Sequence, residues 1–210
     1  MEWKLRILGV VVLLLLPLAG CDDSEPAATD GGTDTDTGTD ANANCDGGMG
    51  DCGAPWGWYD EATGLCWELT PGDSVAVQDD AVAICASSSS GGHCNWRIPT
   101  ISELRSALRG CEETMTGGVC GVTDECFDED DCWTEEACYP QCDTGGPGTG
   151  GCLWDAAIIG DCGAGQQYRS FWSSSHSGSA VWRVHFGSGA IDSWDDMEAA
   201  ARPWCVRTGP

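Results

Sequence analysis

Fifteen cysteines in a chain of 210 residues restrict what this sequence can fold into more than any other feature. An oxidising compartment turns such a count into a disulfide framework, whereas a reducing compartment uses it for metal ligands. Zinc sites need closely paired cysteine or cysteine and histidine ligands, and no Cys-x-x-Cys pair occurs. Four cysteines are instead separated by five residues each: Cys120, Cys126, Cys132 and Cys138. The sequence predicts an exported, disulfide-bonded protein, with structural zinc as the minor alternative.

The first twenty residues support export. Lys4 and Arg6 precede the apolar run Ile7–Leu16, which is the order of a secretory signal. The run is shorter than the roughly 20 apolar residues that a membrane span needs. Residues 18–21, Leu-Ala-Gly-Cys, resemble the lipobox of bacterial lipoproteins, which implies a signal peptide over residues 1–20 and lipidation of Cys21. An ordinary signal peptide followed by a chance cysteine is the alternative.

Lipid on Cys21 would account for the odd cysteine, because the fourteen others can all pair. Two or more acyl chains hold a protein stably on a membrane. We therefore expect a lipid-anchored protein of the cell envelope, with the outer membrane or cell surface favoured. Asp22 resembles a signal that retains some lipoproteins in the inner membrane, which is the alternative location.

Residues 21–50 differ sharply in composition from the rest of the chain. They are mostly Asp, Thr, Gly, Ala and Asn, with no basic residue and almost no large apolar side chain. Such a segment cannot bury enough surface to offset its chain entropy, so we predict a disordered acidic tether. An O-glycosylated stalk on its threonines is compatible with the same geometry.

Acidic residues dominate the charge of the chain. The formal net charge is −25, or about −26 without the signal segment, and the mature part has seven arginines and no lysine. Such a surface repels phosphate and sulfate polymers, which argues against nucleic acid as a partner. The expected partners are the membrane, through the lipid, and a glycan or a surface protein.

Residues 51–210 make up the predicted globular domain. Residues 56–69 carry aromatic and β-favouring side chains around a turn at 62–64, which indicates a hairpin. A helix is expected over residues 75–86, with Asp73 or Ser74 as its cap. The apolar face of that helix would consist of Val75, Val82 and Cys85.

A second helix has the clearest local signal in the sequence. Thr100 follows a proline and stands three residues before Glu103, the spacing of a capping box. We expect this helix to end near Gly110. Its apolar stripe would consist of Ile101, Leu104 and Leu108.

Strands are expected from Phe171 onward. Residues 180–186 alternate with period two, with Trp182, Val184 and Phe186 on one face. Residues 190–194 then return after a glycine turn, and residues 204–207 form the last strand. The predicted class is α+β, with two short helices and a small antiparallel sheet.

Residues 111–165 interrupt this pattern. They contain eight cysteines, many glycines and a cluster of acidic residues. We see too little aliphatic material there for a core. The prediction is a disulfide-rich loop insertion whose order comes from crosslinks rather than from burial.

Four segments carry a family resemblance: WRIPTISEL (96–104), FWSSS (171–175), AVWRVHFGSG (180–189) and WCVR (204–207). In this order and spacing they resemble the Lcl C-terminal domain family, which implies a C-type-lectin-like fold. The resemblance covers about residues 56–106 and 171–207. It implies a disulfide between Cys85 and Cys205, and some members of the family act as surface adhesins. Some members bind sulfated glycans through basic residues, a charge that this sequence lacks. The insertion departs from the compact family pattern.

Tryptophans are the candidate ligand contacts. We expect Trp96, Trp172, Trp182 and Trp204 to pack in the core. Trp133 and Trp154 lie in the insertion with less core to join, so we prefer them as contact residues, together with Trp194. An exposed indole can stack on a sugar ring or on a cation.

Calcium is a weaker candidate, and no other cofactor is expected. Trp194-Asp195-Asp196 resembles one of the calcium-binding triplets of C-type lectins, but the companion Glu/Gln-Pro-Asn/Asp triplet is absent. Asp128 and Asp130 are spaced like alternate loop ligands, yet the segment lacks the glycine and terminal glutamate of an EF-hand. Solvated acidic surface is the preferred interpretation of both.

Catalysis is not expected. Residues 97–104 are similar to a segment of formylglycine-generating enzymes, but Cys205 alone follows Cys162, so a late reactive pair is missing. The serines of 173–175 with His176 or His185 lack a nucleophile elbow. The sequence therefore favours a non-catalytic binding or adhesion module, and a structural envelope protein is the alternative.

Overall fold

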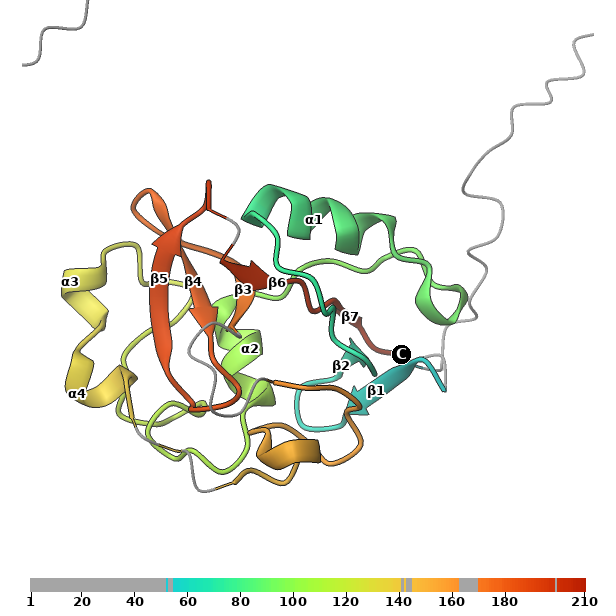
Figure 1. The fold of residues 1–210 in the computed structure, drawn as a ribbon, viewed down its shortest axis with the longest axis horizontal. Coiled ribbons are helices and arrows are strands. Elements are labelled where there is room, and N and C mark those ends of the chain that lie inside the picture. Colours follow the sequence, from blue (N-terminus) through green and yellow to red (C-terminus); the bar gives the residue numbers. More distant parts are fainter. Residues whose placement is uncertain (1–51, 53–54, 141, 143–144, 163–169, 199) are drawn as a thin grey trace, which may run out of the picture. The chain divides into compact units, whose positions relative to one another are not determined.

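A computed structural model describes residues 52, 55–140, 142, 145–162, 170–198 and 200–210 (Figure 1). The predicted signal peptide, the tether and the lipidation site Cys21 lie outside the described residues. Among the described helices none has the length and apolar character needed to cross a membrane. The described part mixes short helices with two small sheets and several disulfides.

The first sheet is built on the predicted hairpin. Strands β1 (Gly57–Asp60) and β2 (Leu65–Glu68) pair antiparallel, and β7 (Val206–Thr208) pairs antiparallel with β2. Asp60 Oδ1 accepts the Ala62 N–H at 3.1 Å in the connecting turn. Gly64 ends the turn with φ +71°, a conformation that favours glycine.

The second sheet has the order β5-β4-β3-β6. Its strands are β3 (Ser170–Ser177), β4 (Ala180–Val184), β5 (Ile191–Asp195) and β6 (Ala201–Arg202). The expectation of one antiparallel sheet was wrong in two respects, because there are two described sheets and β6 pairs parallel with β3. The chain crosses from the end of β5 to the far edge of the sheet, so β6 runs in the same direction as β3.

Helix α1 (Gln78–Ser87) begins later than predicted. Residue Ala76 is still extended, since its N–H donates to Ala201 O at 2.9 Å. The predicted apolar face was also wrong: Val75 and Val82 are exposed, whereas Cys85 is buried. The helix instead packs on the domain through Gln78, Ala81 and Cys85. Neither Asp73 nor Ser74 caps it, because the N-cap position is Val77 and no side chain caps the helix.

Helix α2 (Ile101–Ala107) begins where the sequence predicts, but it ends before the expected stop at Gly110, because Leu108 is already extended. Thr100 Oγ1 accepts the Glu103 N–H at 3.2 Å, and Glu103 Oε2 accepts the Thr100 N–H at 2.8 Å. Arg97 also pairs with Glu103 through two hydrogen bonds. The predicted apolar stripe of Ile101, Leu104 and Leu108 is fully buried.

The insertion contains two single-turn helices, α3 (Glu129–Cys132) and α4 (Glu135–Cys138). The short 3-10 turn η2 (Thr149–Gly151) follows them, and a similar turn, η1 (Ser90–Gly92), follows α1. All eight cysteines of the insertion pair with one another: Cys111–Cys142, Cys120–Cys138, Cys126–Cys132 and Cys152–Cys162.

Two further disulfides hold the rest of the domain. Cys52 pairs with Cys66, and Cys85 of α1 pairs with Cys205 beside β7, the pairing that the resemblance implies. The second of these spans 120 residues and joins the first helix to the end of the chain. Cys94 is disulfide-bonded as well.

The insertion contributes directly to the core, which corrects the expectation that it lacks one. Leu153, Trp154 and Ile158 are buried together with residues of α2 and β4. Leu153 N–H donates to Phe186 O at 2.8 Å, and this bond aligns the segment with the end of β4. The insertion has few large apolar residues, and this short stretch buries three of them.

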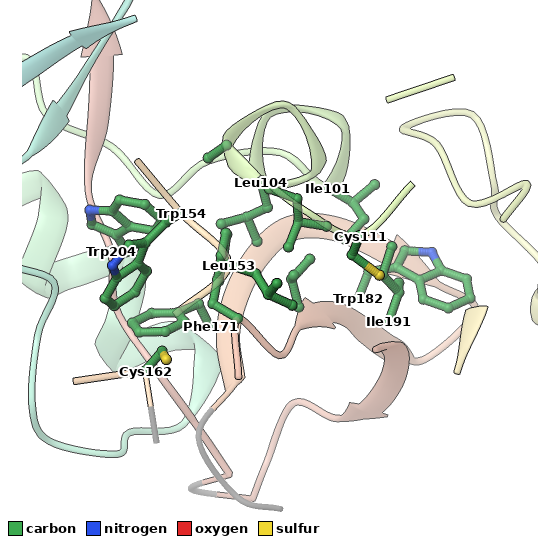
Figure 2. Close-up of a cluster of buried hydrophobic side chains, with 14 of the residues drawn as sticks. Ile101, Leu104, Cys111, Leu153, Trp154, Cys162, Phe171, Trp182, Ile191 and Trp204 are labelled. Atoms are coloured by element: carbon green, nitrogen blue, oxygen red, sulfur yellow. The ribbon is translucent and has the colours of Figure 1, made fainter. Parts of the chain in front are cut away.

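Figure 2 shows Trp154, Trp204 and Phe171 gathered at one end of this core, with Trp182 and Ile191 at the other. The Trp154 ring centroid lies 5.4 Å from that of Trp204 and 5.9 Å from that of Phe171. Gly148 is required beside this indole, because a Cβ there would lie 2.2 Å from Trp154 Cδ1. Trp154 therefore belongs to the core.

Arg105 of α2 connects the insertion to this helix through hydrogen bonds. Its side chain is buried and donates hydrogen bonds to four main-chain carbonyls of the insertion. The acceptors are the carbonyl oxygens of Thr114, Met115, Cys120 and Val122. Burial lowers the pKa of the Arg105 guanidinium below its ordinary value. The sequence offers no local pattern that would predict this contact.

Candidate ligand-contact surface around Trp194

The β4–β5 hairpin has an inner face and an outer face, and the outer face is buried at Val181 of β4 and opens to solvent at Trp194 of β5. Trp182 and Val184 of β4 point into the main core, as their alternation predicts. Arg183 lies on the opposite face, directly across from Asp192 of β5. Trp194 is two residues further along β5 and therefore shares the outer face with Asp192.

Arg183, His185 and Asp192 form a charged cluster on this outer face. Arg183 Nε and Nη2 donate to the two Asp192 oxygens at 2.6 and 3.0 Å. His185 Nε2 lies 3.2 Å from Asp192 Oδ2. Burial raises the pKa of Asp192, but hydrogen bonds from His185 and Arg183, together with their charges, outweigh it and hold this pKa below its ordinary value.

Arg183 of this cluster also contacts the exposed side chain of Trp194. The Arg183 guanidinium carbon lies 4.4 Å from the centroid of the Trp194 ring, within the range of a cation–π contact. Trp194 Nε1 donates to Glu198 Oε2 at 3.0 Å. These two contacts fix the orientation of an indole that is still 41% exposed.

Three acidic residues follow the exposed indole in the chain, and one of them, Glu198, contacts it. Asp195 and Glu198 are exposed, and Asp196 is half-buried. Asp195 Oδ1 accepts the Met197 N–H at 2.9 Å, which shapes the turn after β5. We call Trp194, Asp195, Asp196 and Glu198 the Trp194 surface. Its indole could stack on a sugar ring or a cation, while its carboxylates could accept hydrogen bonds from a ligand.

The two tryptophans preferred from sequence have other roles. Trp154 is fully buried, so the expectation that it contacts a ligand was wrong. Trp133 is half-buried, and its Nε1 donates to Ile191 O at 2.6 Å. Because β5 is an edge strand, this bond and the Ser193–Glu129 hydrogen bond cover its open side with the insertion. Figure 1 shows α3 and α4 beside β5.

Within the part of the chain that the structure describes, the four acidic residues considered for calcium do not belong to a group of three potential ligands. Asp128 Oδ1 accepts the Asp130 N–H and caps α3. Within the described ranges, one group of three potential metal ligands has its donor atoms within 4.8 Å: Cys111, Glu113 and Cys142. Its two sulfurs are joined in a disulfide, so this group offers no thiolate.

The residues considered for catalysis also have structural partners. Cys205 is bonded to Cys85. Ser173 Oγ donates to Trp182 O at 2.7 Å, whereas His185 faces Asp192. The expectation of core tryptophans is confirmed for Trp96, Trp172, Trp182 and Trp204, which are all buried.

Sequence reasoning missed the residues that support Trp194. Arg183, Asp192 and Glu198 carry no motif, and no residue of this set was proposed from sequence. An antiparallel register for residues 180–186 and 190–194 would have placed Arg183 opposite Asp192, which is the one signal that was available. Glu198 depends on the turn after β5 and has no such signal.

Comparison with known proteins gives one family. No curated protein and no solved structure matches the chain significantly. The Lcl C-terminal domain matches residues 58–207, which include all four resembling segments and the insertion between them. The match covers more than half of the sequence. The chain therefore belongs to the Lcl C-terminal domain family.

Proposed function

We propose that this protein is a membrane-anchored lipoprotein of the cell envelope that displays a non-catalytic binding module for a glycan. The observation that carries the binding proposal is Trp194, an indole that is 41% exposed although two side-chain contacts hold its orientation. An aromatic ring held in place in the free protein loses little conformational entropy when a ligand stacks on it. That geometry suits the flat apolar face of a sugar.

The fold supports the proposal in a second way. The short helices and two small sheets are compatible with a C-type-lectin-like domain. So is the disulfide between Cys85 and Cys205, which joins residues 120 positions apart in the sequence. The insertion lies beside β5, next to the Trp194 surface, as the Trp133 and Glu129 contacts show. We propose that the insertion acts as a rigid support for this surface.

The lipid anchor rests on sequence. The lipobox-like residues 18–21 and the pairing of the described cysteines fit an exported lipoprotein. Incorporation of an alkyne-labelled fatty acid in cells tests this directly. We expect labelling of the natural chain and no labelling of Cys21→Ser, with Ser24→Ala as a matched control that keeps its label. Equal labelling of all three chains would contradict the anchor.

A glycan array tests the binding module. Residues 22–210, exported behind a signal peptide that is removed without lipidation, would be applied with and without calcium. We expect specific glycan signals that Trp194→Ala removes. The more exposed Trp56, at 63%, provides a matched control, so Trp56→Ala should leave the signals unchanged. An array without any signal would contradict glycan binding.

A structural envelope protein is the second candidate. Helix α1 leaves Val82 and Ile84 39% and 45% exposed, and Val75 just before it is 52% exposed. Exposed apolar side chains on one element are typical of protein contacts. A stable protein partner recovered by cross-linking in cells, lost in Val82→Ser/Ile84→Ser, together with an empty glycan array, would favour this candidate.

A further inference from the structure

The Trp194 surface differs from an ordinary sugar platform in the charge around it. Asp195, Asp196 and Glu198 follow the indole within four residues, and Glu198 contacts it directly. Asp195 and Glu198 each use one oxygen in a hydrogen bond. The second oxygen of each has no partner among the described residues, and both side chains are exposed. The free oxygen of Glu198 therefore lies close to the ring, and Asp195 adds an exposed carboxylate at the next position of the chain.

The arginines of the domain are already engaged. Arg105, Arg183, Arg202 and Arg207 are buried. The two others that the structure describes, Arg97 and Arg109, lie beside the carboxylates of Glu103 and Asp60. Arg169 is outside the described residues, and the mature chain has no lysine. The described surface therefore has no unpaired cationic side chain with which to bind a sulfated or carboxylated glycan.

The charge of Arg183 does not oppose a cationic ligand at this surface. Its guanidinium is held by both oxygens of Asp192 and is 7% exposed. The pair is close to neutral as a unit, and it covers one face of the indole. The indole is still 41% exposed, so a part of it remains for a ligand, and Glu198 supplies an exposed carboxylate in contact with it.

We infer that the Trp194 surface binds a glycan that bears free amino groups, such as a polymer of deacetylated glucosamine. This inference rests on the proposed function and specifies its ligand. A sugar ring stacks on the exposed part of Trp194, and its ammonium group pairs with Glu198, the carboxylate that contacts the indole. The net charge of the chain, −25, attracts such a polycation and repels anionic glycans.

Isothermal titration calorimetry on residues 22–210 tests the inference. The probes are a glucosamine tetramer, its fully N-acetylated counterpart and a heparin oligosaccharide, at about pH 6, where the sugar amine is protonated. We expect the glucosamine tetramer to bind about tenfold or more tightly than the acetylated tetramer, and heparin not to bind. The preference should shrink at high salt, since exposed charges are screened.

Two variants separate charge from stacking. Glu198→Gln/Asp195→Asn keeps an oxygen that can accept the Trp194 and Met197 N–H groups, so the turn is retained while the charge is removed. It should lower the preference for the glucosamine tetramer to about twofold or less. Trp194→Ala should weaken both tetramers by about tenfold. Trp56→Ala should change neither affinity, and melting temperatures would show that every variant is folded.

Each alternative outcome has a definite meaning. Equal affinity for the two tetramers, or preference for the acetylated one, would overturn the inference and leave the proposed glycan binding intact. The same holds if only other glycans of the array bind. If Trp194→Ala binds the glucosamine tetramer with the affinity of the natural chain, the tetramer is attracted to acidic surface elsewhere. That result would also overturn the inference. Absence of any bound glycan would overturn the proposed function itself.

Discussion

The insertion and the β4–β5 hairpin differ from what their sequences suggest about burial. The insertion was expected to be exposed and the hairpin to be core, yet each contains a tryptophan with the opposite exposure. The insertion has the composition of a variable loop, yet Trp154 is buried in the core and Arg105 binds four of its carbonyls. The hairpin has the alternation of a core strand, yet its outer face presents Trp194. The composition of a segment predicts whether disulfides or strand pairing hold it in place. The exposure of its side chains depends on which other segments pack against it.

The two regions also obtain their order differently. Both sheets are ordered by strand pairing and by burial of side chains from both of their faces in two apolar clusters. The insertion has only single-turn helices, and four disulfides close it internally. If this contrast is right, substitutions in the two regions should lower the free energy of unfolding by different amounts.

Removing disulfides gives the largest expected contrast. The Cys85–Cys205 bond closes 120 residues, and the Cys126–Cys132 bond closes six. Chain entropy then predicts a loss of about 5 kcal/mol for Cys85→Ala/Cys205→Ala and about 2 kcal/mol for Cys126→Ala/Cys132→Ala. Urea unfolding of both double variants measures the difference. Equal losses would mean that loop closure does not govern the stability of this domain.

Truncating the buried tryptophan of the insertion should cost almost as much. Trp154→Ala removes a fully buried indole from an aromatic cluster, so we expect a loss of about 3–5 kcal/mol in the free energy of unfolding. Trp194→Ala is the matched control, with an expected loss below about 1 kcal/mol. If denaturation shows similar losses for the two, the contrast between buried insertion and exposed hairpin fails.

Replacing Arg105 should loosen the insertion selectively. Arg105→Met leaves buried carbonyls of residues 114–122 without donors, at an expected cost of about 3 kcal/mol. Hydrogen exchange should accelerate over residues 111–122 and change little in β3 and β4. Arg97→Met, at a half-exposed pair with Glu103, should cost less than about 1 kcal/mol. Uniform acceleration across both sheets would show instead that the insertion and the sheets unfold as one unit.

The charged cluster beside Trp194 should make the stability of the domain depend on pH. Because the folded pKa of Asp192 lies below its unfolded value, its contribution is complete above about pH 4 and is lost as the pH falls through the folded pKa. Asp192→Asn should therefore show a flatter loss of stability in acid than the natural chain. Urea midpoints measured between about pH 5 and about pH 2 give the comparison. Parallel profiles would mean that Asp192 is not held ionised by Arg183 and His185.

Local signals explain which parts of the fold could be predicted. The capping box of Thr100 and Glu103 and the 57–68 hairpin depend on neighbouring residues, and both form as expected. The start of α1 depends on the bridge between Ala76 and Ala201, which are far apart in sequence. The two-residue strand β6 is too short to show a pattern.

The candidate site was predictable only in part. Trp194 was proposed as an aromatic contact residue, and Asp195 and Asp196 were proposed because the three residues resemble a calcium-binding triplet. The contacts that hold the indole come from Arg183 across the hairpin and from Glu198 beyond a turn, and neither depends on a sequence motif. Trp154 shows the reverse case, because its burial follows from Leu153 pairing with Phe186 and from the space left by Gly148.

The glycan signal of Trp194→Ala compared with Trp133→Ala tests the central claim most directly. Trp133 is the insertion residue that sequence favours, and its indole N–H bonds to Ile191. With both variants shown to be folded by circular dichroism, we expect Trp194→Ala to lose the signal and Trp133→Ala to retain most of it. Retention in Trp194→Ala together with loss in Trp133→Ala would contradict the account and return the ligand to the insertion.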